Sequence, residues 1–177
     1  MRLTSGGYNI IRTLTGALND SQVKGIESIV STANEYNWTY PQCAYALATV
    51  YHETARTMQP VTESGSASYL QSKKYYPYIG RGLVQITWLN NYKKFSDLLD
   101  IDLVHFPEKA LDLKVSLEIM AKGMTKGLFT GKGYNNLPVR SYNKDDYINA
   151  RRIINGLDKA DVIANYAITM ERALRGL

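Results

Sequence analysis

The sequence predicts a mainly α-helical fold with a small β excursion after its second predicted helix. Its 177 residues suit one domain, and its hydrophobic fraction of 45% and charged fraction of 21% are typical of a globular protein with a buried core. Apolar residues recur at helical spacing in several windows that begin at capping residues. There is no repeat, low-complexity tract or linker, so we expect a single domain over residues 1–177.

The predicted helices begin at recognisable signals. Asn19 and Asp20 offer N-caps for the first helix, and Pro41 fits the first turn of the second. This second helix is rich in small and apolar residues, so we expect it to be the central buried helix. The expected helical ranges are 20–35, 41–55, 90–99, 112–126, 145–154 and 158–175.

Two stretches between the helices have a different character. Residues 57–80 are rich in Thr, Ser and Gly, and they predict a loop with a short hairpin. Residues 83–88 alternate weakly between apolar and polar, and they predict a short strand with Gln85 and Thr87 on the same side. A second long loop is expected over residues 127–143, where three glycines occur.

The net charge of +5, from 21 basic and 16 acidic residues, favours an anionic partner. Nucleic acid, acidic lipid and anionic cell-wall polymer all meet that description. The basic residues are spread along the chain rather than clustered with aromatics, so we expect no nucleic acid partner. Fourteen tyrosines against three phenylalanines provide flat faces with hydroxyls, which suit sugar-like ligands, although partly exposed core tyrosines would also explain them.

The one cysteine, Cys43, excludes an intramolecular disulfide and lies in an apolar run, where we interpret it as a buried small side chain. Residues 1–7 contain no apolar signal core, and no run approaches the roughly 20 apolar residues that span a bilayer. We therefore expect synthesis in the cytoplasm without a signal peptide and without stable membrane insertion.

Two short motifs suggest sites that the rest of the sequence does not support. His52-Glu53 matches the start of the zinc motif H-E-x-x-H, but position 56 is Arg56 and the other histidine is the distant His105. Gly80-Arg81-Gly82 matches the start of a dinucleotide loop, but the sixth position is Gln85 rather than glycine. We expect neither a metal site nor a cofactor.

Glu53 and Glu63 are the candidate catalytic pair. Glu53 falls in the last turn of the apolar second helix, where the negative end of the helix dipole favours a protonated carboxyl. Glu63 falls in a polar loop, where it would stay ionised. Two carboxyls in contrasting environments suit the acid and base of sugar hydrolysis, whereas the alternative is a pair of solvated surface charges.

Polar side chains follow this pair along the chain. Gln85, Thr87 and Asn91 could hold a water molecule and a sugar amide near the carboxyls. Alternatively, they could satisfy buried backbone groups. The glycines on either side of Arg81 would let the backbone turn tightly beside a ligand.

Three motifs together resemble the family 19 glycoside hydrolases. They are His52-Glu53-Thr54, the segment from Gly80 to Tyr92, and Arg151 to Gly156. This family includes class I chitinases and endolysins of bacteriophages that infect Gram-negative bacteria. The resemblance runs from about residue 20 to the C-terminus, and it implies a lysozyme-like α+β fold with a cleft between two lobes.

The resemblance also implies roles for individual residues. Glu53 would protonate the glycosidic oxygen, Glu63 would activate a water molecule from the other face, and Thr87 would hold that water, so that the sugar is inverted. Substrate contacts are implied or expected at Gln85, Asn91, Tyr78, Arg81 and Asn155. The family also has a downstream arginine, for which Arg172 is a candidate. The interval between the two glutamates is shorter than in the plant enzymes, as in phage-type members.

Small size and positive charge favour an endolysin over a secreted chitinase. We expect a monomer that binds peptidoglycan glycan strands and hydrolyses their β-1,4 bonds as a muramidase, with no separate cell-wall-binding domain. It would wait in the cytoplasm of the host bacterium until a holin-type pore admits it to the periplasmic peptidoglycan, and it would then cause lysis. The alternatives are a chitinase, a lytic transglycosylase and a non-catalytic binding module.

Overall fold

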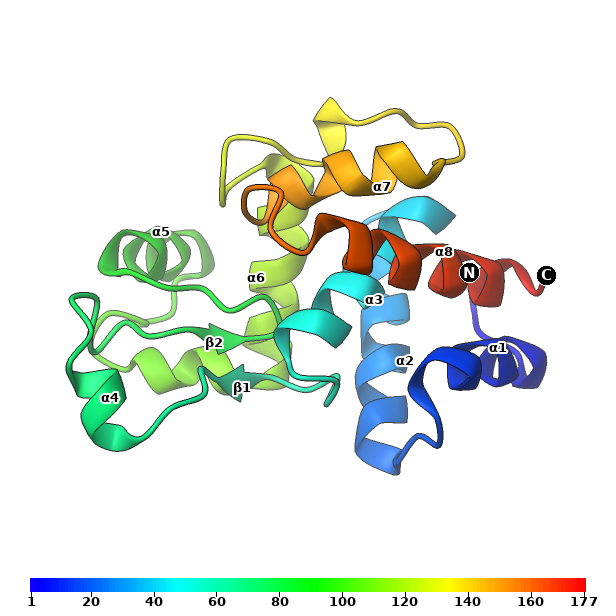
Figure 1. Ribbon diagram of the computed structural model, residues 1–177. Coiled ribbons are helices and arrows are strands. Elements are labelled where there is room, and N and C mark those ends of the chain that lie inside the picture. The colour runs from blue at the N-terminus through cyan, green and yellow to red at the C-terminus, as the bar shows by residue number, and fades with distance from the viewer.

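The computed structural model describes all 177 residues and confirms a mainly helical fold with one small two-stranded sheet (Figure 1). The six helices expected from the sequence are present with ends that differ by a few residues. The elements are α1 (Ser5–Thr15), α2 (Asp20–Glu35), α3 (Tyr40–Glu53), β1 (Val61–Thr62), α4 (Ala67–Gln71), β2 (Arg81–Gly82), α5 (Leu89–Leu99), η1 (Pro107–Leu111), α6 (Leu113–Lys126), η2 (Tyr134–Asn136), α7 (Lys144–Ala150), η3 (Arg151–Ile153) and α8 (Ala160–Arg175).

Helix α3 is the centre of the core, as its composition predicts. Every residue from Cys43 to Tyr51 is buried, and α3 packs along α8 and beside α2. Burial raises the pKa of the Cys43 thiol to about 12, so this cysteine is an inert core residue. Because the helix is buried almost to its C-terminus, its last residue, Glu53, emerges directly from the core.

The chain turns sharply immediately after Glu53. The hydroxyl of Thr54 donates to the carbonyl of Val50 and accepts from the backbone N–H of Met58. Ala55 and Arg56 then adopt left-handed backbone conformations, with φ of 48° and 74°. This turn, held by the buried hydroxyl of Thr54, fixes the end of α3, and therefore the place from which the Glu53 side chain leaves the helix.

Helix α1 was not expected, because its sequence begins with two glycines. Thr4 caps it by accepting from the N–H of Gly7, and α1 packs against α8 near the two chain ends (Figure 1). A Cβ atom at Gly7 would lie 2.6 Å from the carbonyl oxygen of Ala173. The glycine that weakens the helix in isolation is therefore what allows it to pack so closely against α8.

The strand expected over residues 83–88 is wrong. The sheet consists of β1 and β2, which are antiparallel with Val61 opposite Gly82. After β2 the chain folds back, and the N–H of Arg81 and that of Ile86 each donate to the other residue's carbonyl. Gln85 has a φ of 58°, which a continuing strand does not tolerate, so the segment is a tight turn that β2 enters.

Figure 1 shows two groups of elements on either side of α6. The sheet, α4 and α5 lie on one side, and α1, α2, α3, α7 and α8 lie on the other. None of the helices has both the length and the continuous apolarity that crossing a bilayer requires.

Candidate active site

Glu53 forms a buried ion pair with Arg151, the first residue of η3. The Nη1 atom of Arg151 donates to Oε1 of Glu53 at 2.8 Å, and its Nε donates to the carbonyl oxygen of Asp158 at 2.9 Å. The Arg151 side chain is only 3% exposed and that of Glu53 is 18% exposed. A guanidinium that is buried to this degree requires an anionic partner, and Glu53 supplies it.

The pair leaves one carboxyl oxygen of Glu53 available. Oε2 makes no hydrogen bond within the protein, and Glu53 lines a cavity of about 330 Å³. Glu53 is therefore held in place through one carboxyl oxygen, while its other oxygen has no partner within the protein.

The cavity lies where α3, the turn after β2, the start of α5 and the segment after η3 meet. Its size is within the range of small-molecule sites. Aromatic and aliphatic side chains alternate with polar groups around it, which suits a sugar ring with its hydroxyls. The lining residues are Glu53, Val84, Gln85, Ile86, Thr87, Trp88, Asn91, Phe129, Ile154 and Asn155.

Three polar residues expected at the site line this cavity, and they also bond the backbone. Gln85 donates from Nε2 to the carbonyl oxygens of Val61 and Gly82 at 2.8 and 3.0 Å. Thr87 donates its hydroxyl to the carbonyl of Gln85, and Asn91 donates from Nδ2 to the carbonyl of Thr87. These bonds fit the alternative that the three side chains satisfy backbone groups, and their contact with a water molecule or a sugar stays a prediction.

Glu63 lies immediately after β1, and two donors hold its carboxylate. The Tyr75 hydroxyl donates to Oε1 at 2.7 Å, and the backbone N–H of Gly80 donates to Oε2 at 2.9 Å. The bond to Glu63 is the main reason that the pKa of Tyr75 is raised to about 12, so this hydroxyl stays protonated at neutral pH. Both oxygens of the Glu63 carboxyl are therefore fixed by donors.

Glu63 does not line the cavity itself, and Gly80 connects it to the cavity wall. A Cβ atom at Gly80 would lie 2.8 Å from Oε1 of Gln85 and 3.5 Å from Oε2 of Glu63. The Glu63 carboxylate and the Gln85 amide are therefore neighbours across a bare glycine backbone. Glu63 therefore lies close to the side chain of Gln85, which is one of the residues that line the cavity.

Trp88 presents an exposed indole at the same cavity. Its side chain is 53% exposed, and its ring lies edge to face with Tyr75, with centroids 5.2 Å apart. The backbone N–H of Trp88 donates to the carbonyl of Tyr78. The backbone of Trp88 has a φ of 74°, and this conformation turns the ring outward from the start of α5. An exposed aromatic face beside a polar cavity is suited to stacking against a sugar.

Chitinase C has the same fold in two crystal structures. The chain matches chitinase C from Streptomyces griseus with a TM-score of 0.66 and 21% identity, over 94% of this chain and 75% of that one. It matches a glutamate-to-glutamine mutant of chitinase C with a TM-score of 0.62 and 21% identity, over 93% of this chain and 88% of that one. This chain has the chitinase C fold. No protein-family model and no curated protein gives a significant match.

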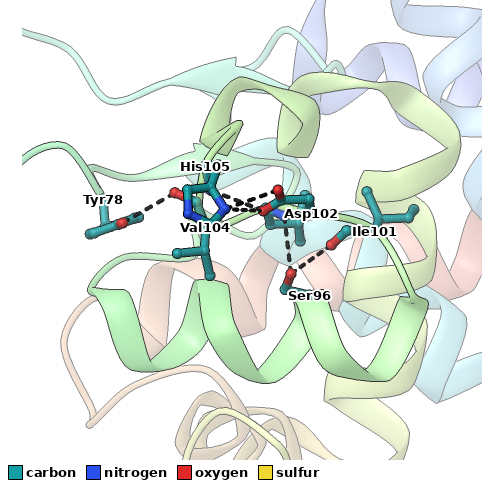
Figure 2. Close-up of polar contacts among 7 residues, drawn as sticks. Tyr78, Ser96, Ile101, Asp102, Val104 and His105 are labelled. Atoms are coloured by element: carbon teal, nitrogen blue, oxygen red, sulfur yellow. Dashed lines mark hydrogen bonds and ion pairs between the residues drawn. The ribbon is translucent and has the colours of Figure 1, made fainter.

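Within this chitinase fold, Tyr78 and Arg81 hold the loop that precedes β2. The Tyr78 hydroxyl donates to the carbonyl of Val104 at 3.1 Å, as Figure 2 shows, and its ring packs against Tyr92. Arg81 donates from Nη1 to the carbonyl of Pro77 and to the Tyr92 hydroxyl, each at 3.0 Å. Neither residue lines the cavity, and their expected contact with a substrate stays a prediction.

The loop after α5 that receives Tyr78 is itself well anchored (Figure 2). Ser96 donates its hydroxyl to the carbonyl of Ile101, and the exposed His105 donates its backbone N–H to Asp102. The N–H of His105 is also the largest reason that the pKa of Asp102 is lowered. Tyr78, and with it the loop between β1 and β2, is therefore attached to an ordered surface turn.

The remaining expectations concern Asn155, Arg172 and metal binding. Asn155 lines the cavity, with its amide oxygen accepting from the N–H of Gly156 at 2.8 Å. Arg172 lies exposed on α8, whereas the arginine that contacts Glu53 is Arg151. The chain has no cluster of three or more His, Cys, Asp or Glu residues that could hold a metal ion.

Sequence reasoning singled out neither Arg151 as the partner of Glu53 nor Tyr75 as the partner of Glu63. The signal available for Arg151 was its place at the start of the third motif, Arg151 to Gly156. Tyr75 follows two lysines in a polar loop, and nothing local distinguishes it from Tyr76, whose side chain is 46% exposed.

Proposed function

We propose that this protein is a glycoside hydrolase that cleaves β-1,4 bonds between N-acetylated amino sugars by general acid–base catalysis. The observation that carries the proposal is the contrast between Glu53, which lines the cavity, and Glu63, which lies close to the cavity-lining Gln85. One carboxyl oxygen of Glu53 has no hydrogen bond within the protein, whereas both oxygens of Glu63 are bonded to donors. The chitinase C fold supports this reading.

In the proposed mechanism, Oε2 of protonated Glu53 gives its proton to the glycosidic oxygen as the bond to the anomeric carbon breaks. Glu63 accepts a proton from a water molecule, and that water forms the new bond to carbon from the opposite face. The leaving sugar departs with a new hydroxyl, and the anomeric configuration inverts. Arg151 stabilises the charge that remains on Glu53 after the proton has left.

The other cavity residues would position the two reactants. Gln85, whose amide adjoins Gly80 and therefore Glu63, and Thr87, whose hydroxyl bonds the carbonyl of Gln85, would hold the attacking water. Asn91 and Asn155 would bond the substrate amide and hydroxyl groups, and Trp88 would offer a stacking face. Holding both reactants in line is worth several orders of magnitude in rate.

We further propose that the natural substrate is peptidoglycan and that the protein serves as a bacteriophage endolysin. It would act as a monomer on periplasmic peptidoglycan after release from the host cytoplasm through a holin-type pore. The net charge of +5 supports an anionic polymer over neutral chitin, because it would draw the protein to the wall in a salt-dependent manner.

Two other activities remain as alternatives that one experiment separates. Chitin hydrolysis is favoured by the likeness to chitinase C, and a lytic transglycosylase would need an acid but no water-activating base. Products from purified sacculi and from soluble chitin oligomers should be analysed by mass spectrometry and reducing-end assay. The proposal predicts new reducing muramic acid ends from sacculi. Anhydro-muramic ends, or turnover confined to chitin oligomers, would contradict it.

A further inference from the structure

A second, smaller cavity lies beside the candidate active site and is lined by two basic residues. Its volume is about 220 Å³, and Lys132 and Arg152 supply its charges. No carboxylate lines it. The other lining residues are Gly131, Asn136, Leu137, Asn149 and Ile153.

The two cations in this cavity have no partner within the protein. The side chains of Lys132 and Arg152 form neither an ion pair nor a hydrogen bond, and the Asn149 amide is also free. Asp145 lies one helical turn before Asn149 on α7 but does not line the cavity. By contrast, Arg151 is paired with a carboxylate. Two unpaired cations and a free amide in one concavity suit a carboxylate ligand.

This basic cavity shares two walls with the cavity that contains Glu53. Phe129 lines the catalytic cavity, and Lys132 lines the basic one from the same loop. Ile154 lines the catalytic cavity, and the adjacent Ile153 lines the basic one. A ligand group in the basic cavity would therefore lie within a few residues' span, roughly 10 Å, of a sugar in the catalytic cavity.

A hydroxyl holds the two shared walls together. Thr130 donates to the carbonyl of Arg152 and is also within 3.3 Å of the carbonyl of Ile153, and it accepts from the N–H of Lys132. Lys94 on α5 donates to the carbonyl of Leu128, which ties the same loop to the opposite side of the catalytic cavity. The spacing between the two cavities is therefore fixed by the fold.

We propose that the basic cavity is a subsite for a carboxylate of the peptide stem carried by peptidoglycan. This proposal rests on the proposed function. Each muramic acid bears a lactyl-linked peptide with free carboxylates, and this stem projects sideways from the glycan strand. A strand lying in the catalytic cavity would place a stem beside the shared wall, where Lys132 and Arg152 meet its charge. Chitin carries no such group, so the subsite would favour peptidoglycan over chitin.

The test compares two forms of one polymer. Purified sacculi are used intact, or after an amidase has removed their peptide stems, which takes away the stem carboxylates and leaves one short lactyl carboxylate next to each muramic acid ring. The variant Lys132→Ala/Arg152→Ala is compared with the wild type and with a control, Arg12→Ala/Lys24→Ala, which removes two exposed charges from α1 and α2. We expect the Lys132/Arg152 variant to lose about three- to tenfold in kcat/KM on intact sacculi. On stripped strands it should match the wild type.

The other outcomes are equally informative. An equal loss on intact and stripped strands, no loss on either, or the same loss from the control variant would overturn the subsite. The charge-preserving variant Lys132→Arg/Arg152→Lys should retain most activity on intact sacculi if charge is what matters. A wild type inactive on both polymers would overturn the proposed function itself, whereas an active wild type with an unaffected variant overturns the subsite alone.

Discussion

Nη1 of Arg151 lies 2.8 Å from Oε1 of Glu53, although the two residues are 98 positions apart in the sequence. The contact joins the end of the central helix α3 to the first residue of η3, near the C-terminal part of the chain. Because Arg151 is buried, its charge depends on Glu53 for compensation. The pair therefore links the stability of the fold to the geometry of the proposed acid.

Replacing Arg151 should damage both stability and activity. Arg151→Met removes the cation from a buried pair, which typically costs about 3 kcal/mol, and it frees the Glu53 carboxyl to rotate. Urea unfolding and reducing-end release measure the two effects. Arg175→Met is the matched control, since Arg175 forms an (i, i+4) pair with Glu171 on α8 and should cost under about 1 kcal/mol. Equal stability losses in the two variants would contradict the account.

Replacing Tyr75 by Phe should lower activity by loosening Glu63. The change removes one of the two donors that hold the Glu63 carboxyl, so only the N–H of Gly80 still orients it. We expect kcat/KM to fall by a few fold, with a fold that is unchanged by circular dichroism. A kcat/KM equal to that of the wild type would show that Tyr75 does not position Glu63.

Gly80→Ala should lower activity more than stability. The new methyl group would lie 2.8 Å from Oε1 of Gln85 and 3.3 Å from Cβ of Glu63, so the Gln85 amide must move. Gln85 holds the turn through Val61 and Gly82, and its displacement would disturb the cavity wall. Turnover and thermal unfolding of the variant should be measured beside the wild type, and turnover should fall more than the unfolding temperature. Wild-type turnover would mean that the close approach of Glu63 and Gln85 has no catalytic role.

The surface pair of Arg140 and Asp146 predicts a pH-dependent contribution to stability. The hydrogen bond from Arg140 is the largest reason that the pKa of Asp146 is lowered. A lowered pKa in the folded state means that the contribution is present above the unfolded pKa of about 4 and is lost as the pH falls. Arg140→Ala should destabilise the protein by about 0.5 kcal/mol at pH 7. Urea unfolding at pH 7, 5 and 3 should show this difference narrowing, and a constant difference would be inconsistent with it.

Most helices could be predicted from the sequence because capping residues and apolar spacing lie within each helix or directly beside it. Asn19 caps α2 and Pro41 lies in the first turn of α3, as expected. Helix α1 was missed because Gly7 is explained only by its contact with Ala173 on a distant helix. The strand predicted over residues 83–88 was wrong because we gave more weight to the weak alternation of apolar and polar residues than to Gly82, which precedes it. Glutamine rarely adopts a left-handed backbone, so nothing in the sequence indicated the φ of 58° at Gln85.

In the candidate site too, the residue with a local sequence signal could be predicted, and its long-range partners could not. The position of Glu53 followed from an apolar helix that ends in a carboxylate. Its partner Arg151 could not be chosen from the sequence, since the contact depends on how η3 packs against α3. Likewise, Tyr75 reaches Glu63 only because the loop between β1 and β2 folds back on itself.

The central claim is that Glu53 supplies the proton that breaks the glycosidic bond, and Glu53→Gln tests it most directly. Reducing-end release from purified sacculi should be measured for this variant beside the wild type, after circular dichroism has shown that both are folded. The account predicts a loss of at least about 100-fold, because an amide cannot donate the proton. Activity within a few fold of the wild type would contradict it.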